Sequence, residues 1–341
     1  MDKPSVHVGV LGAGLIGGSI CKSLRECGHA DIHVFSQSAS TVSDVEHEGF
    51  AVSSSIEELV ASSDVLFICV PLDVQGKVFA SVAQAISTTG RTDILVTDVS
   101  SVKGSEARDA IDLFESVGAT FIPGHPMAGT EHSGFLSSTA DMFVGATWVL
   151  CPERATPDQV LVLFGLIRAM NARVSMLDID SHDAGVATIS HLPYVVAASL
   201  LNVLSIGDNQ SLALQLAAGS FRDGTRVAGS EPWLSASMIT FNREHVQTLL
   251  TRFQGVLGGM QRAIENEDDE AVLAFFEKAR SLRDEYSAVK LTTESTELSW
   301  PKDGALANLV AVCRAGALVH SITESGSQWS VLLEGKDLPR N

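Results

Sequence analysis

The first half of the chain alternates short apolar runs with longer stretches of helical periodicity. The apolar runs are typical of buried strands and cover residues 6–12, 32–36, 64–71, 93–99, 119–124 and 147–152. Helical patterns separate them, for example at 15–27, 73–87 and 104–117. Strands that alternate with helices pair in parallel through right-handed crossovers, so the pattern predicts an α/β domain with a doubly wound parallel sheet of the Rossmann type.

The second half has almost no strand pattern. Between residues 180 and 286 the periodicity is helical, in the segments 182–206, 209–219, 231–264 and 269–286. We therefore predict a dinucleotide-binding domain at 1–178, an all-helical domain at 179–287 and a C-terminal extension at 288–341. Long amphipathic helices often bury their apolar faces against a second copy, so the helical domain predicts a homodimer.

The C-terminal extension carries a weaker pattern. It has one helical run at 303–318 and one strand-like run at 328–333. These favour a terminal arm that packs on the rest of the protein over a reduced regulatory unit.

A glycine-rich turn follows the first apolar run and opens the first helix. It reads Gly12-Ala13-Gly14-Leu15-Ile16-Gly17, a G-x-G-x-x-G pattern. Gly12 permits a tight turn, Gly14 lets the backbone approach a pyrophosphate, and Gly17 lets the helix pack on the strand. The amides of Leu15 and Ile16 begin the helix and can donate to phosphates. The turn predicts a dinucleotide cofactor.

In such domains, a residue at the end of the second strand normally hydrogen-bonds the ribose of the cofactor. NAD sites usually have an acidic residue there, whereas this chain has Ser36 and Gln37, with no acidic or basic residue beside them. NADP or NAD therefore remains open, with a slight preference for NADP. Val70 and Pro71, at the end of the third apolar run, are also expected to contact the cofactor.

Composition narrows the class of protein. The 341 residues are 45% hydrophobic and 19% charged, which suits a folded chain with a large core. The net charge of −18 argues against nucleic acids and anionic membranes as partners. Five cysteines without a C-x-x-C pair favour reduced thiols and no metal site. We see neither a leader peptide nor an apolar run long enough for a bilayer, so we expect a cytoplasmic protein.

Candidate chemistry gathers at the end of the fifth apolar run. Residues 121–134 read FIPGHPMAGTEHSG, and His125 stands where a strand opens into a polar loop that holds Thr130 and Glu131. Loops at strand ends often carry catalytic groups in α/β enzymes. Two more polar clusters interrupt the helical half, at 189–194 and 219–226. Arginines beside glycines in the second cluster fit an anion site in so acidic a chain.

These segments together resemble the prephenate/arogenate dehydrogenases of tyrosine biosynthesis. The matching pieces are GAGLIGGSI (12–20), TDVSSVKG (97–104), PGHPMAGTEHSG (123–134), HDAGVATISHLPY (182–194) and AAGSFRDGTRVAGSEP (217–232). The resemblance implies a Rossmann domain, a helical dimerisation domain and a cyclohexadienyl carboxylate substrate. The implied reaction transfers a hydride to NAD(P)+ and releases carbon dioxide, giving 4-hydroxyphenylpyruvate or tyrosine.

The resemblance also implies roles for individual residues. His125 would accept a hydrogen bond or a proton from the C4 hydroxyl of the substrate, and Ser101 would orient His125 and touch the same hydroxyl. Arg226 would bind a substrate carboxylate with help from Asp223. The other residues implied to contact the substrate are His191, Tyr194, Thr130 and Glu131.

Two departures from the family pattern affect the substrate pocket. Many members have S-H-L-P-H where this chain has Tyr194 in place of the last histidine. The tryptophan that follows the arginine motif is displaced, here to Trp233. The choice between prephenate and arogenate therefore stays open. So do two alternatives, a dehydrogenase for a prephenate analogue in secondary metabolism and a non-catalytic NAD(P) sensor.

Overall fold

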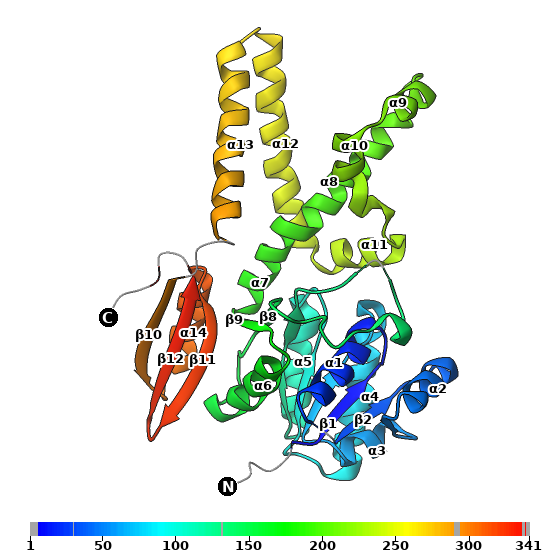
Figure 1. Ribbon diagram of the computed structural model, residues 1–341, viewed down its shortest axis with the longest axis vertical. Helices are drawn as coiled ribbons and strands as arrows, with labels where there is room; N and C mark the ends of the chain where they lie inside the picture. Colours follow the sequence, from blue (N-terminus) through cyan, green and yellow to red (C-terminus); the bar gives the residue numbers. More distant parts are fainter. Residues whose placement is uncertain (1–5, 30, 131, 290–293, 336–337, 339–341) are drawn as a thin grey trace. The chain divides into compact units, whose positions relative to one another are not determined.

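The chain folds into two compact units. A computed structural model describes residues 6–29, 31–130, 132–289, 294–335 and 338 (Figure 1). The first unit contains residues 1–182 and 292–341, and the second contains residues 183–291. The chain therefore leaves the first unit, forms the second and returns, so the C-terminal extension belongs to the first unit. The expected boundaries at 178 and 287 each fall a few residues before these crossings.

The first unit is built on a parallel sheet with the strand order β3-β2-β1-β4-β5-β6. Its strands are β1 (Val8–Leu11), β2 (Ile32–Phe35), β3 (Ala51–Val52), β4 (Val65–Ile68), β5 (Leu95–Asp98) and β6 (Thr120–Ile122). The order reverses direction at β1 and β4, which places a topological switch point beside the glycine-rich turn. The predicted doubly wound parallel sheet is confirmed.

Alternate residues of the buried strands face opposite layers of helices. On β4, Phe67 belongs to the core that includes helix α1, whereas Leu66 and Ile68 belong to the core that includes α3, α4 and α5. The helices are α1 (Leu15–Glu26), α2 (Ala39–His47), α3 (Ile56–Ala61), α4 (Leu72–Thr89) and α5 (Gly104–Ser116). Strands that are buried on both faces have continuous apolar sequences, and these runs predicted the strands.

A second sheet of the same unit differs from the expectation. The run 119–124 was expected to be one strand, but it divides into β6 and β7 (Gly124–Pro126) around Pro123, which has no amide hydrogen for a ladder. β7 pairs antiparallel with β8 (Thr147–Leu150), and β8 pairs parallel with β9 (Arg173–Met176). Helix α6 (Pro157–Ala169) connects β8 to β9, and a short 3₁₀ turn (Phe135–Ser137) follows the loop after β7.

The C-terminal extension continues this second sheet. Its elements are β10 (Glu294–Pro301), α14 (Ala305–Arg314), β11 (Leu318–Ser325) and β12 (Gln328–Gly335). They extend the sheet in the order β10-β12-β11-β9-β8-β7, with Val319 of β11 opposite Val174 of β9. Leu309 and Trp329 join the same core as Trp148 of β8. The extension thus packs on the first unit, and sequence patterns had revealed α14 and β12 but neither β10 nor β11.

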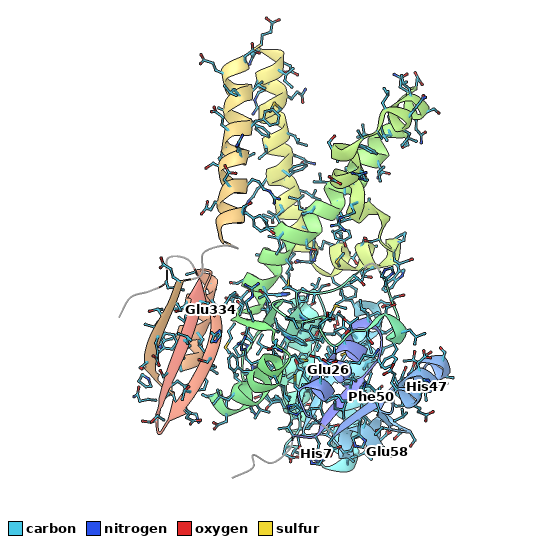
Figure 2. All side chains as sticks on the ribbon, viewed as in Figure 1. His7, Glu26, His47, Phe50, Glu58 and Glu334 are labelled. Carbon is cyan, nitrogen blue, oxygen red and sulfur yellow. The ribbon has the colours of Figure 1, made fainter. Side chains whose placement is uncertain are left out.

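Charged side chains cover the outside of the first unit. Glu26 at the end of α1 and Glu58 of α3 are exposed, whereas Phe50, which precedes β3, is buried (Figure 2). The guanidinium of Arg25 lies 4.1 Å from the centre of the Phe50 ring. Its long side chain covers apolar surface while its charge remains in water.

The second unit is entirely helical in its described part. Its elements are α7 (Ile179–Val186, shared with the first unit), a π-helix (Ala187–His191), α8 (Leu192–Leu204), α9 (Gln210–Leu216), α10 (Gly219–Thr225), a 3₁₀ turn (Arg226–Gly229), α11 (Pro232–Phe241), α12 (Arg243–Glu265) and α13 (Asp269–Val289). α12 and α13 form an antiparallel pair (Figure 1). Pro193 has no amide hydrogen to donate to the preceding turn, which accounts for the π-helix before α8.

The helices of the second unit bury few of their own apolar residues. Val203, Ile206, Leu216 and Phe276 are each more than 60% exposed in the isolated chain. By length and composition, the helical stretch Ile179–Leu204 is apolar enough to cross a membrane, so the expectation that no run is long enough is wrong. A helix that packs its apolar face against other helices meets the same criterion of length and hydropathy. The stretch also contains three polar residues, His182, Asp183 and His191.

Candidate active site

The glycine-rich turn has the geometry of a phosphate-binding loop. Gly12 has a φ of +93°, and a side chain there would collide with the carbonyl oxygen of Cys69. A side chain at Gly17 would collide with the carbonyl of Gly12, whereas a Cβ at Gly14 would meet nothing within 4 Å. α1 begins at this open position without a side-chain cap. The turn therefore fits a dinucleotide, with space at Gly14 and helix amides beside it.

The residue opposite Gly12 stays uncharged. Burial raises the pKa of the Cys69 thiol well above its usual range. A neutral thiol adds no negative charge beside the phosphates. Val70 and Pro71 follow Cys69 after β4, and Pro71 occupies the N-cap position of α4 without a capping hydrogen bond from its side chain.

The end of β2 presents hydroxyl groups. Ser36 Oγ accepts a hydrogen bond from the Ser38 amide at 3.3 Å, and Ser38 Oγ caps α2 by accepting from the Thr41 amide at 3.3 Å. Ser38 Oγ also lies 2.9 Å from Ser40 Oγ, and Gln37 is exposed. This hydroxyl-rich turn stands where an acidic ribose ligand would stand in an NAD site.

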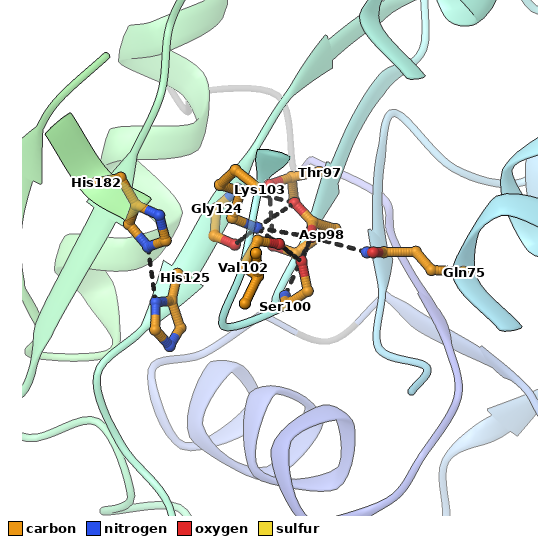
Figure 3. A network of polar contacts seen from close by, with 9 residues as sticks. All are labelled: Gln75, Thr97, Asp98, Ser100, Val102, Lys103, Gly124, His125 and His182. Atoms are coloured by element: carbon orange, nitrogen blue, oxygen red, sulfur yellow. Dashed lines mark hydrogen bonds and ion pairs between the residues drawn. The ribbon is translucent and has the colours of Figure 1, made fainter. Parts of the chain in front are cut away.

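A buried ion pair lies between the two sheets of the first unit. Lys103 Nζ is 2.8 and 2.7 Å from the two carboxylate oxygens of Asp98, and both side chains are almost completely buried (Figure 3). Gln75 Nε2 donates to Asp98 Oδ2 at 2.8 Å, the Ser100 amide donates to the same oxygen at 3.0 Å, and the Ser100 hydroxyl donates to it as well. A buried pair is favourable only when further hydrogen bonds satisfy both ions, and this network supplies them.

The ion pair holds the residue before His125. The Gly124 amide donates to Asp98 Oδ1 at 3.0 Å, and Lys103 Nζ donates to the Gly124 carbonyl (Figure 3). A Cβ at Gly124 would lie 2.8 Å from the backbone oxygen of Asp98. Only glycine allows β7 to approach β5 so closely. Lys103 and Asp98 both stand in the segment 97–104, and the sequence alone gave neither of them a role.

His125 is buried at the centre of β7, with 8% of its surface exposed. Its Nδ1 lies 2.9 Å from Nε2 of His182, which is 2% exposed. Ser101, half-buried on the turn after β5, makes no hydrogen bond to His125 among the described residues. His182 is thus a hydrogen-bonding partner of His125, and it stands in the motif 182–194, where the sequence had assigned it no role.

The polar loop after β7 is only partly described. Thr130 is exposed, and its Oγ1 accepts from the His132 amide at 3.2 Å. Glu131 lies outside the described residues.

The substrate residues expected in the helical half all lie in the second unit. His191 is fully buried, with Nδ1 3.2 Å from Asn242 Nδ2. The same Asn242 amide donates to the Asp183 carbonyl at 2.8 Å, and its Oδ1 lies 3.0 Å from His245 Nδ1. Asn242 thus holds the π-helix to the start of α12, a contact that no local sequence pattern indicates.

The arginine cluster is exposed. Arg226 and Asp223 both face solvent, and Asp223 lies 3.6 Å from Arg222 Nε. Arg226 makes no ion pair within the described part of the chain. Tyr194 OH accepts a 3.4 Å hydrogen bond from Ser230 beside this cluster. An exposed guanidinium without an acidic partner can pair with an anion.

Two sequence profiles match the chain over most of its length. The nucleotide-binding domain of prephenate dehydrogenase matches residues 20–176, and the dimerisation domain of prephenate dehydrogenase matches residues 178–278. The chain belongs to the prephenate dehydrogenase family. The matches end before the C-terminal extension.

Individual members of the prephenate dehydrogenase family are similar to this chain. A cyclohexadienyl dehydrogenase of Zymomonas mobilis is 29% identical over 81% of this chain and 94% of its own. The crystal structure of Synechocystis arogenate dehydrogenase is 30% identical, with a TM-score of 0.73, over 82% of this chain and 99% of that one. The structure of Aquifex aeolicus prephenate dehydrogenase with hydroxyphenyl propionate and NAD+ is 25% identical, with a TM-score of 0.75, over 84% and 100%. These relatives therefore support the assignment of this chain as a dehydrogenase that uses a nicotinamide cofactor.

Proposed function

We propose that this protein catalyses the oxidative decarboxylation of prephenate or arogenate with a nicotinamide cofactor. The observation that carries the proposal is the buried His125 on β7, whose neighbour Gly124 is hydrogen-bonded to Asp98 at the end of β5 of the parallel sheet, in a chain of the prephenate dehydrogenase family. When bound, the cofactor accepts the hydride from C4 of the ring. The turn at Gly12, Gly14, Leu15, Ile16 and Gly17 would hold its phosphates.

His125 would act on the hydroxyl of the same carbon. A neutral imidazole accepts the hydroxyl proton as the C–H bond breaks, which favours formation of the carbon–oxygen double bond. Loss of carbon dioxide from C1 then returns an electron pair to the ring, which becomes aromatic. Charges balance without net release of a proton, so His125 returns its proton to the phenolic oxygen. Ser101 is proposed to touch the same hydroxyl.

The remaining roles concern orientation of the substrate. Arg226 would pair with a carboxylate, and Asp223 would help to position Arg226. His191, Tyr194, Thr130 and Glu131 would line the substrate site. Aromatisation provides the driving force, so these residues mainly need to orient the reactants.

The family profile and the exposed helices support a homodimer. The matched profile is named for dimerisation, and the second unit leaves large apolar residues such as Ile206 and Leu216 exposed. Large apolar residues exposed on the helices of a dimerisation domain are typical of a protein interface. We propose that a second copy covers it.

One assay tests the proposed reaction. Purified protein is mixed with prephenate or arogenate, each with NAD+ or NADP+, and reduction is followed at the nicotinamide absorbance. Turnover of at least one pair is expected. Cofactor binding without turnover of either substrate would favour the sensor or a dehydrogenase for another cyclohexadienyl compound.

Replacement of Arg226 with alanine should raise KM for the substrate by at least about tenfold, because a charge-assisted hydrogen bond contributes about 1.5–3 kcal/mol. Arg222 is the matched control, since it is exposed in the same segment and already lies near Asp223. Arg222→Ala should change KM little. An unchanged KM in Arg226→Ala, together with a loss of stability, would assign Arg226 a structural role.

We propose that the enzyme uses NADP+ at least as well as NAD+, because Ser36 stands where an acid would repel the 2′-phosphate. Ser36→Asp should shift the ratio of kcat/KM values toward NAD+ by about tenfold, or about 1.4 kcal/mol. Ser43→Asp places the same charge on an exposed position of α2 and should shift the ratio less. A wild type that already prefers NAD+ by about a hundredfold would contradict the proposal.

A further inference from the structure

Two buried histidines share one hydrogen bond in the first unit. His125 Nδ1 and His182 Nε2 are 2.9 Å apart, and the rings meet edge to face with their centres 5.1 Å apart (Figure 3). At this distance a single proton lies between the two nitrogens. Either His125 donates it or His182 does, and the two arrangements give His125 opposite properties.

The proton position decides whether His125 can act as a base. If His182 donates, the neutral His125 ring carries its own proton on Nε2, and that nitrogen can only donate to a substrate hydroxyl. If His125 donates from Nδ1, its Nε2 keeps a lone pair and can accept the hydroxyl proton. Only the second arrangement suits the reaction proposed above, and it requires His182 Nε2 to accept.

We propose that His182 is a positioning residue that holds His125 in the Nδ1–H tautomer. The inference rests on the proposed function. His182 accepts from Nδ1–H throughout the reaction, and this hydrogen bond strengthens while His125 carries the extra proton, because charge-assisted hydrogen bonds are stronger than neutral ones. Since the reaction releases no net proton, His182 does not need to carry one away. It fixes the orientation and tautomer of its neighbour, as outer partners of functional histidines do.

Paired variants of His182 separate the hydrogen bond from packing. His182→Met fills a similar volume without an acceptor of comparable strength, whereas His182→Gln can place Oε1 where Nε2 stood. We expect kcat to fall about a hundredfold in His182→Met with KM changed less than about threefold, and to recover to within about tenfold of wild type in His182→Gln. A role in packing alone would predict no such recovery.

The tautomer of His125 can be observed directly by ¹⁵N NMR of the full-length protein labelled on histidine, with His125→Asn to assign the signals. The proposal expects an Nδ1–H ring for neutral His125 in the wild type and in His182→Gln, and a shift toward Nε2–H in His182→Met. An Nε2–H tautomer in the wild type, or unchanged kcat in His182→Met, would overturn it. Because the NMR measurement needs no turnover, it tests the tautomer even if the wild type oxidises neither substrate, a result that would count against the proposed function instead.

Discussion

Replacement of His125 with asparagine should lower kcat by about a hundredfold or more while the protein remains folded, because that is the usual contribution of a general acid or base. The asparagine amide reaches roughly the position of Nδ1, so it can keep a hydrogen bond to His182. It has no group at the position of Nε2, where the substrate hydroxyl would be accepted. The change therefore removes the base and preserves its support.

Steady-state kinetics with the preferred substrate and cofactor checks this expectation. His132→Asn is the matched control, since His132 is an exposed histidine of the loop that follows β7, and its kcat should stay near that of the wild type. Circular dichroism of both variants should match the wild type. Turnover near the wild-type rate in His125→Asn would remove His125 from the proposed mechanism.

The nucleotide-binding half was predictable because its signals are local. Apolar runs such as that of β4 face helices on both sides, and the positive φ at Gly12 calls for glycine within one short motif. The second sheet was less visible. β10 and β11 are half-exposed strands with weak alternation, and pairing with β12, and for β11 also with β9, places them in the sheet.

The contacts of the candidate site were beyond local patterns. His125 and His182 are 57 positions apart, and Asp98 binds the amide of a glycine that is 26 positions away. No helical or strand period connects such residues, since the pairings depend on how β5, β7 and α7 pack. Family resemblance indicated the segments that matter, and the structure supplied the partners within them.

Replacement of Lys103 with methionine should cause the largest loss of stability among the changes considered. It leaves the Asp98 carboxylate buried without its cation, and breaking a buried pair from one side costs about 3–5 kcal/mol. It also removes the donor to the Gly124 carbonyl, so the backbone before His125 loses its contact with Lys103 and keeps that with Asp98. We expect both the unfolding free energy and kcat to fall, which denaturant unfolding and kinetics would show.

Three further variants identify the origin of that loss: Lys302→Met, Asp98→Asn, and Lys103→Met combined with Asp98→Asn. Lys302→Met removes a lysine that pairs with Asp158 and Glu324 at the surface, and it should change the unfolding midpoint little. Combining Lys103→Met with Asp98→Asn removes both charges, so no buried ion is left alone, and Gly124 can still donate to the asparagine oxygen. The double variant should therefore be more stable than Lys103→Met, by about 1 kcal/mol or more. A double variant as unstable as the sum of its single changes would show that the two side chains act independently, and that the pair does not hold Gly124 as a unit.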